Sequence, residues 1–222
     1  MHQLKPLHES FYNIIFGKLR SLDAIIVCEG ATEAEIAKVI AKKLKLGESL
    51  KLGVTNSEGL TNVPKVTSAV AVLVTLARRL KAIGVLVDAE NMDSLSRARS
   101  IVDSMRSQNI NVNHLKPLES GECTNVYEAS IVSSQVKLVI VVSGDPSLPF
   151  KTHTIEDHGV KLKILGGHIS IEELSNYENA KEIMRREDLI REVEQSKPEH
   201  VREAFKNIYC AIKHVEILAE TV

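Results

Sequence analysis

The stretch IIVCEGATEAE, residues 25–35, decides the fold, because an apolar run passes through a glycine-containing turn directly into a helical pattern. The apolar run 23–28 is short and bounded by turn residues, which is typical of a buried strand. Residues 32–46 place apolar side chains on one helical face and lysines on the other. We expect Thr32 to cap this helix, with Glu35 three residues later as in a capping box. The stretch therefore predicts a strand, a sharp turn and a helix in succession.

The same alternation continues along the chain. We expect further strands at 49–54, 82–87, 110–115 and 136–144, and helices at 65–81, 94–109 and 125–134. The segment HTIEDHGVKLKIL, residues 153–165, fits both helical and strand spacing, and we predict a helix. Continuous apolar strands that alternate with helices indicate an α/β fold with a parallel sheet covered by helices on both faces, similar to a Rossmann fold.

The composition divides the chain into three parts. We expect an N-terminal helix at 1–21, an α/β domain at 22–168, and a charged C-terminal helical appendage at 169–222. The appendage is interrupted once, at Lys197-Pro198. Its helices are a candidate surface for a homodimer or for a protein partner.

Charge and cysteine usage restrict the class of protein. The 222 residues contain 28 Lys and Arg against 29 Asp and Glu, so a nucleic-acid partner would need a local basic surface. The three cysteines, Cys28, Cys123 and Cys210, are scattered, which favours free thiols in a reducing compartment over a disulfide framework. Neither a signal peptide nor an apolar run of membrane-spanning length is present in the sequence. We therefore expect a cytoplasmic protein that does not enter a membrane.

Acidic residues follow two of the predicted strands. Glu29 ends the first strand, Asp88 and Glu90 end the strand at 82–87, and Glu33 lies in the first turn of a helix. Sites in open parallel sheets form at the carboxyl ends of the strands, and residues i and i+2 of an extended strand face the same way. Two carboxylates about 4 Å apart repel by roughly 4 kcal/mol at an effective dielectric of about 20, and a divalent cation relieves that repulsion. Oxygen ligands without nearby His or Cys favour Mg²⁺ or Mn²⁺.

These residues carry a resemblance to a known family. IIVCEGATEAE followed by GVLVDAEN, residues 84–91, resembles the Toprim domain, and its Glu-Gly motif resembles the form found in OLD-family nucleases. The connector GLTNVPKV, residues 59–66, and the acidic pair Glu156-Asp157 are similar to further parts of that family. The resemblance covers residues 22–165, and Glu90 departs from it, because the family usually has Asp there. The chain looks like a small, stand-alone Toprim protein.

The resemblance implies magnesium-dependent phosphoryl transfer on nucleic-acid phosphodiesters, DNA or RNA, most simply by a nuclease. It implies Glu29 as general acid or base and as a metal ligand, with Asp88 and Glu90 as the other ligands. Glu33 and Asp157 would be ligands of a second metal ion.

Several alternatives remain open from the sequence. A non-catalytic Toprim-fold protein that binds or regulates in nucleic-acid metabolism would keep the same residues. Glu33 is equally explained by its favourable charge at a helix N-terminus. SGDPSLPF, residues 143–150, could bind phosphate, but it also fits an ordinary Asp-Pro turn. A phosphatase or receiver-type acidic pocket fits less well, because no nucleophilic Asp precedes the first helix.

Overall fold

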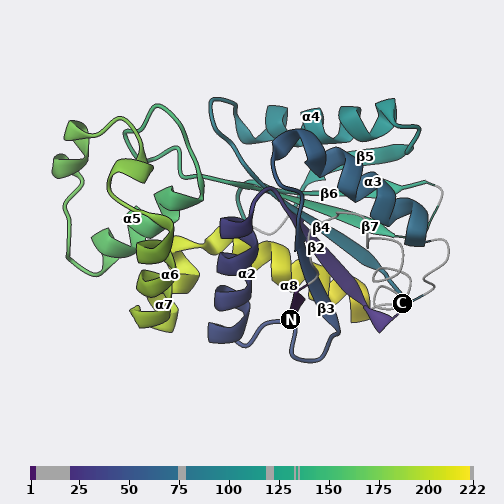
Figure 1. Cartoon of the computed structure of the whole chain (residues 1–222), viewed down its shortest axis with the longest axis horizontal. Coiled ribbons are helices and arrows are strands. Elements are labelled where there is room, and N and C mark those ends of the chain that lie inside the picture. The colour runs from purple at the N-terminus through teal and green to yellow at the C-terminus, as the bar shows by residue number, and fades with distance from the viewer. Residues whose placement is uncertain (4–20, 75–78, 119–122, 133, 135, 221–222) are drawn as a thin grey trace.

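The computed structural model describes residues 1–3, 21–74, 79–118, 123–132, 134 and 136–220 of the chain (Figure 1). The N-terminal helix predicted at 1–21 lies almost wholly outside these residues. The described strands, in chain order, are β1 His2–Gln3, β2 Ala24–Cys28, β3 Leu52–Asn56, β4 Ala82–Asp88, β5 Val112–Pro117, β6 Val126–Ile131 and β7 Lys137–Ser143. They form one seven-stranded sheet in the order β1-β3-β2-β4-β7-β6-β5.

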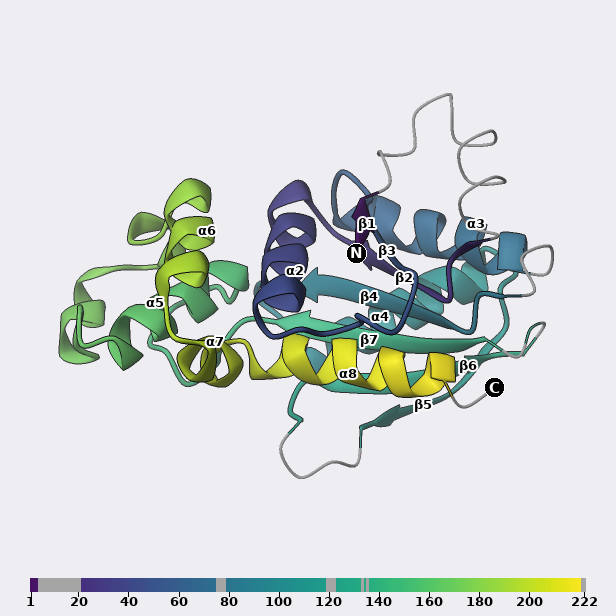
Figure 2. The same cartoon turned by 90° about the horizontal axis from the view of Figure 1, so that it is seen from below.

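The helices cover both faces of this sheet, as the sequence predicted. They are α2 Ala31–Lys43, α3 Val63–Val74, α4 Ser94–Ser107, α5 Ile155–Leu165, α6 Arg186–Gln195, α7 Pro198–Ala204 and α8 Lys206–Glu220, with short 3₁₀ turns η2 Leu60–Asn62, η3 Glu172–Asn176 and η4 Ala180–Glu182. Alternate residues of the strands divide between two apolar layers, one shared with α2 and α8 and the other with α3 and α4 (Figures 1 and 2). The helix predicted at 153–165 is confirmed by α5.

One edge of the sheet differs from the prediction. Five neighbouring strands, in the order β1-β3-β2-β4-β7, pair in parallel. Strand β6 pairs antiparallel with both β7 and β5. The helix predicted at 125–134 is therefore wrong, since β6 occupies that segment. Tyr127, Ala129 and Ile131 all face the layer of α3 and α4, which is the period-two pattern of a strand. The predicted parallel sheet holds for five of the seven strands.

The C-terminal segment is helical, as predicted, but its last helix belongs to the sheet. Ile208, Ile212 and Val215 of α8 are buried in the same apolar layer as β2, β4 and β7, and α8 lies along the sheet (Figure 2). Helices α6 and α7 pack against α5, and α6 also packs against α2, so their apolar side chains continue the same layer. The boundary predicted at residue 169 would thus place α8 outside the α/β domain, although α8 shares an apolar layer with β2, β4 and β7. The homodimer or partner surface expected on these helices stays a prediction.

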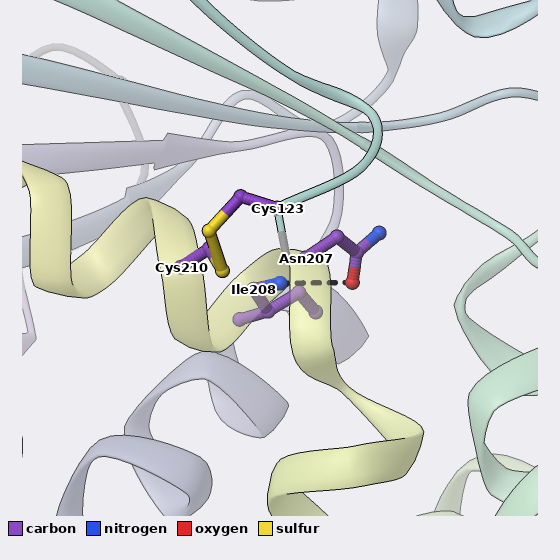
Figure 3. Close-up of a disulfide and its surroundings, with 4 residues drawn as sticks. All are labelled: Cys123, Asn207, Ile208 and Cys210. Atoms are coloured by element: carbon purple, nitrogen blue, oxygen red, sulfur yellow. Dashed lines mark hydrogen bonds between the residues drawn. A yellow bond between two sulfur atoms is a disulfide. The ribbon is translucent and has the colours of Figure 1, made fainter. Parts of the chain in front are cut away.

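A disulfide joins α8 to the loop before β6, so the predicted free thiols are wrong for two of the three cysteines. Cys123 and Cys210 are bonded across 87 residues of sequence, with their Cα atoms 5.7 Å apart (Figure 3). Cys28 is free and buried. The spacing of the cysteines in the sequence does not predict that Cys123 and Cys210 lie close together, because their proximity depends on where α8 crosses the sheet. Beside the bridge, Asn207 donates a hydrogen bond of 2.9 Å to the carbonyl oxygen of Val142 in β7. No helix in the described ranges is long and apolar enough to cross a membrane.

Candidate active site

The first two acidic residues meet at the carboxyl ends of adjacent strands. β2 and β4 are neighbours in the sheet and pair in parallel, with Cys28 opposite Leu86. The backbone amide of Glu29 donates to the carbonyl oxygen of Leu86 at 2.9 Å. The Oε2 of Glu29 in turn accepts a hydrogen bond of 3.2 Å from the backbone amide of Asp88. Burial raises the pKa of Glu29, and the negative charges of Glu33 and Glu90 raise it further, against the hydrogen bond from Asp88.

Gly30 and Glu33 pack against each other at the start of α2. Gly30 is the N-cap of this helix, in place of the predicted Thr32, and no side chain caps the helix. Its backbone is extended, and an added Cβ would lie 2.7 Å from the Oε2 of Glu33, so a larger residue here would displace the Glu33 carboxylate. Burial raises the pKa of Glu33, while hydrogen bonds from the backbone amides of Glu33 and Gly30 oppose the shift. The helix start thus holds the Glu33 carboxylate at the sheet edge.

Asp88 is the most deeply buried of the acids at the ends of β2 and β4. Its side chain is almost fully buried, and its Oδ1 has no hydrogen-bond partner. Burial raises the pKa of Asp88 well above its usual range, and the negative charges of Glu33, Glu29 and Glu156 add to the shift. We call Glu29, Glu33, Asp88 and Glu156 the acidic cluster. Its members come from the ends of β2 and β4 and from the first turns of α2 and α5.

Glu90 does not share the orientation of Asp88. The predicted parallel orientation assumed an extended backbone, but β4 ends at Asp88 and Glu90 has a φ of +52°. The Glu90 side chain is 48% exposed and accepts a hydrogen bond of 3.0 Å from Arg97 of α4. Its backbone pairs with His153, with N–O distances of 2.7 and 2.9 Å. Glu90 is thus close enough to raise the pKa of Glu29, but it is already neutralised by a cation.

The two acids of the predicted pair in α5 take different positions. Glu156 raises the pKa of both Glu33 and Asp88 through its charge, and its Oε2 accepts a hydrogen bond of 2.6 Å from the Thr154 hydroxyl. Asp157 instead accepts hydrogen bonds from the backbone amide of Asp145 at 2.9 Å and from His153 at 2.8 Å. The structure therefore places Glu156, which the sequence prediction left out of the site, within the acidic cluster.

Asp157 joins α5 to the turn that follows β7. Burial raises its pKa to about 6, while the hydrogen bonds from Asp145 and His153 act in the opposite direction. Asp145 accepts hydrogen bonds from the amide and hydroxyl of Ser147 and from Lys161 of α5, so SGDPSLPF forms a turn whose acid is already paired. The Asp-Pro turn interpretation of this motif accounts for all these contacts.

The charge of a lysine from the C-terminal segment acts on the acidic cluster. The positive charge of Lys181, in η4, lowers the pKa of Glu33 and of Asp88. Sequence patterns gave no signal for this residue, because η4 reaches the sheet edge only through the packing of α5 against the C-terminal segment.

The acidic cluster fits a hard divalent cation in its donor type. Within the described part of the chain, no three His, Cys, Asp or Glu side chains already converge closely enough to hold a metal ion. The donors are carboxylate oxygens, which Mg²⁺ and Mn²⁺ prefer. The unpaired, buried Oδ1 of Asp88 is an acceptor without a donor, and such groups are rare unless an ion or water satisfies them.

The comparisons with known proteins give a distant structural likeness. No protein-family model and no curated protein sequence matches the chain. The C-terminal region of the OLD protein of Xanthomonas campestris pv. campestris aligns with 89% of this chain and 96% of its own, at 14% identity and a TM-score of 0.39. The C-terminal region of the Burkholderia pseudomallei OLD protein aligns with 86% of this chain and 98% of its own, also at 14% identity and a TM-score of 0.39. The likeness concerns the general path of the chain.

Proposed function

We propose that the chain is a magnesium- or manganese-dependent phosphoryl-transfer protein that acts on nucleic-acid phosphodiesters, most simply as a nuclease. The observation that carries the proposal is Asp88, whose buried carboxylate keeps one oxygen unpaired among three other acids. Burying several carboxylates together costs free energy, and structures keep such an arrangement mainly at functional sites.

The proposed ligands are Asp88, Glu29, Glu33 and Glu156. A bound divalent cation would neutralise phosphate charge and polarise the bond that is broken. Glu90 is a further candidate ligand that would have to leave Arg97. Asp157, a predicted ligand, acts in this proposal by holding His153 and the turn after β7.

Glu29 is the proposed general acid or base. A raised pKa brings a carboxyl group closer to neutral pH, where proton transfer is most effective. The hydrogen bond from the Asp88 amide engages only the Oε2 of Glu29, and the carboxyl group is not fully buried. The other oxygen is therefore the candidate atom for taking or giving the substrate proton. Lys181, whose charge lowers the pKa of Glu33 and Asp88, is the candidate cation for a non-bridging oxygen of the phosphate.

Cleavage of plasmid DNA, single-stranded DNA and structured RNA, first with Mg²⁺ and then with Mn²⁺, tests the proposal. Glu29→Gln should lower turnover by about 10²–10⁴-fold, the usual contribution of general acid–base catalysis. Asp88→Asn should abolish both turnover and the heat of metal binding in calorimetry. Asp103→Asn, an exposed acid of α4, is the matched control and should behave as wild type. Wild-type turnover that survives Glu29→Gln would point to another site or a contaminating nuclease.

A second candidate is a non-catalytic protein that binds nucleic acid or regulates its metabolism. It is favoured by the pairing of Glu90 with Arg97 and by the lack of three converging ligands in the described ranges. Metal binding at Asp88 without turnover on any of the three substrates would support this candidate over a nuclease.

A further inference from the structure

A second polar site lies at the opposite end of α5 from the acidic cluster. Lys163, His168, Lys197 and His200 line a pocket of about 620 Å³ between the end of α5, α6 and the start of α7. We call it the basic pocket. Glu192 is its one acidic lining residue, in a chain whose net charge is −1. Among the described residues, neither Lys163 nor Lys197 has an acidic partner within ion-pair distance.

Helix dipoles do not account for this grouping. Lys163 lies in the last turn of α5, where a cation favours the helix. Lys197, however, is the N-cap of α7, where a cation has no such benefit. His168 is held over Gly166 so closely that an added Cβ would lie 2.8 Å from its ring. Basic side chains from separate segments thus face one pocket without acidic partners for the lysines.

The geometry of α5 links the basic pocket to the acidic cluster. Glu156 and Lys163 are seven residues apart, about 20° short of two full helical turns, so both lie along one face of α5. Their separation along the helix axis is about 10.5 Å, at 1.5 Å per residue.

A second element lies near both sites. The positive charge of Lys181 in η4 lowers the pKa of Asp88, and Ile183, directly after η4, lines the basic pocket.

We propose that the basic pocket binds the phosphodiester backbone of the nucleic-acid strand whose reacting phosphate lies at the acidic cluster. This inference rests on the proposed function for its ligand, but it concerns binding and not hydrolysis. The lysines supply charge, and the histidine rings supply N–H donors to phosphate oxygens. The pocket thereby sets the position of the strand relative to Glu29 and Asp88.

The test measures binding without divalent metal, so that cleavage plays no part. Fluorescence anisotropy follows a labelled single-stranded oligonucleotide of about 12 nucleotides, within the usual site sizes of such proteins, over a series of salt concentrations in EDTA. Lys163→Gln/Lys197→Gln should reduce the slope of log K against log salt by about 1.4, because each lost phosphate contact removes about 0.7. The matched control is Lys65→Gln/Lys116→Gln, which removes two exposed lysines of α3 and β5 and should keep the wild-type slope.

The outcomes separate this inference from the proposed function. Equal slopes for wild type and the Lys163/Lys197 variant, or equal losses in both double variants, would overturn it. If inorganic phosphate binds the basic pocket while the oligonucleotide binds wild type and both double variants equally, the pocket is a site for small anions. That result would overturn the inference as well. A protein that shows the expected slope loss but never cleaves would support the strand site and remove the nuclease. Cleavage by the wild type together with an unchanged slope in the Lys163/Lys197 variant would support the nuclease and remove the strand site.

Discussion

Loss of the Cys123–Cys210 bond should remove a large part of the stability of this chain. The bond closes a loop of 87 residues, and the entropy that such a closure takes from the unfolded chain amounts to about 4.6 kcal/mol at 25 °C. Single domains are stable by only about 5–15 kcal/mol in total. Cys123→Ala is the suitable perturbation, because Cys123 is the less buried partner and its removal leaves the packing of α8 in place.

Urea denaturation followed by circular dichroism measures the effect. The free energy of unfolding should fall by about 2–5 kcal/mol in Cys123→Ala. A reductant should produce the same fall in the wild type and no further fall in the variant, since both treatments break one bond. A thiol assay on the denatured, unreduced wild type should find Cys28 alone. Three free thiols, or a loss below about 1 kcal/mol on reduction, would refute the reasoning from loop closure.

The remaining predictions concern the acidic cluster and its supports. Because folded Asp88 holds its proton more tightly than in the unfolded chain, wild-type stability falls as pH rises from the ordinary aspartate pKa through the raised one. Asp88→Asn should therefore have a higher melting temperature than wild type at neutral pH in EDTA, and the difference should be smaller in acid. A lower melting temperature of the variant at every pH would contradict this. Glu156→Gln should weaken Mn²⁺ binding in calorimetry, whereas Asp157→Asn should lower the melting temperature and leave that affinity nearly unchanged. Arg97→Met should lower the free energy of unfolding in urea by about 1–3 kcal/mol, because it leaves the buried carbonyl oxygen of Ala89 without its donor and Glu90 without its ion-pair partner; an unchanged midpoint would exclude that role.

The sequence identified the strands that position the site because their signal is local. β2 and β4 are fully buried, so each is a continuous apolar run, and each ends where an acidic residue begins to face the sheet edge. Parallel strands have their carboxyl ends at the same edge of the sheet, so the strand assignment predicts that Glu29 and Asp88 share this edge, and the pairing of β2 with β4 then brings them close together.

The features that the sequence did not give depend on tertiary contacts. β6 has a short apolar segment that fits a helix or a strand, and the open edge of β7 decides between them. Glu90 was expected to follow the pleat of β4, but its backbone leaves the strand to pair with His153, which is 63 positions later in the chain. The Cys123–Cys210 bond likewise depends on where α8 crosses the sheet.

Tertiary contacts also decide whether Glu156 or Asp157 faces the acidic cluster. Adjacent residues of a helix point about 100° apart, so only one of these two acids can face the acidic cluster. The rotation of α5 about its axis decides which, and Gly159 packs directly against Leu189 of α6 and Met184, too closely for a larger residue. Helix α6 follows the α/β core in the sequence, and it was expected to be part of a separate appendage. The helical segment that seemed peripheral to the site in the sequence is thus the one that turns Glu156 toward Asp88.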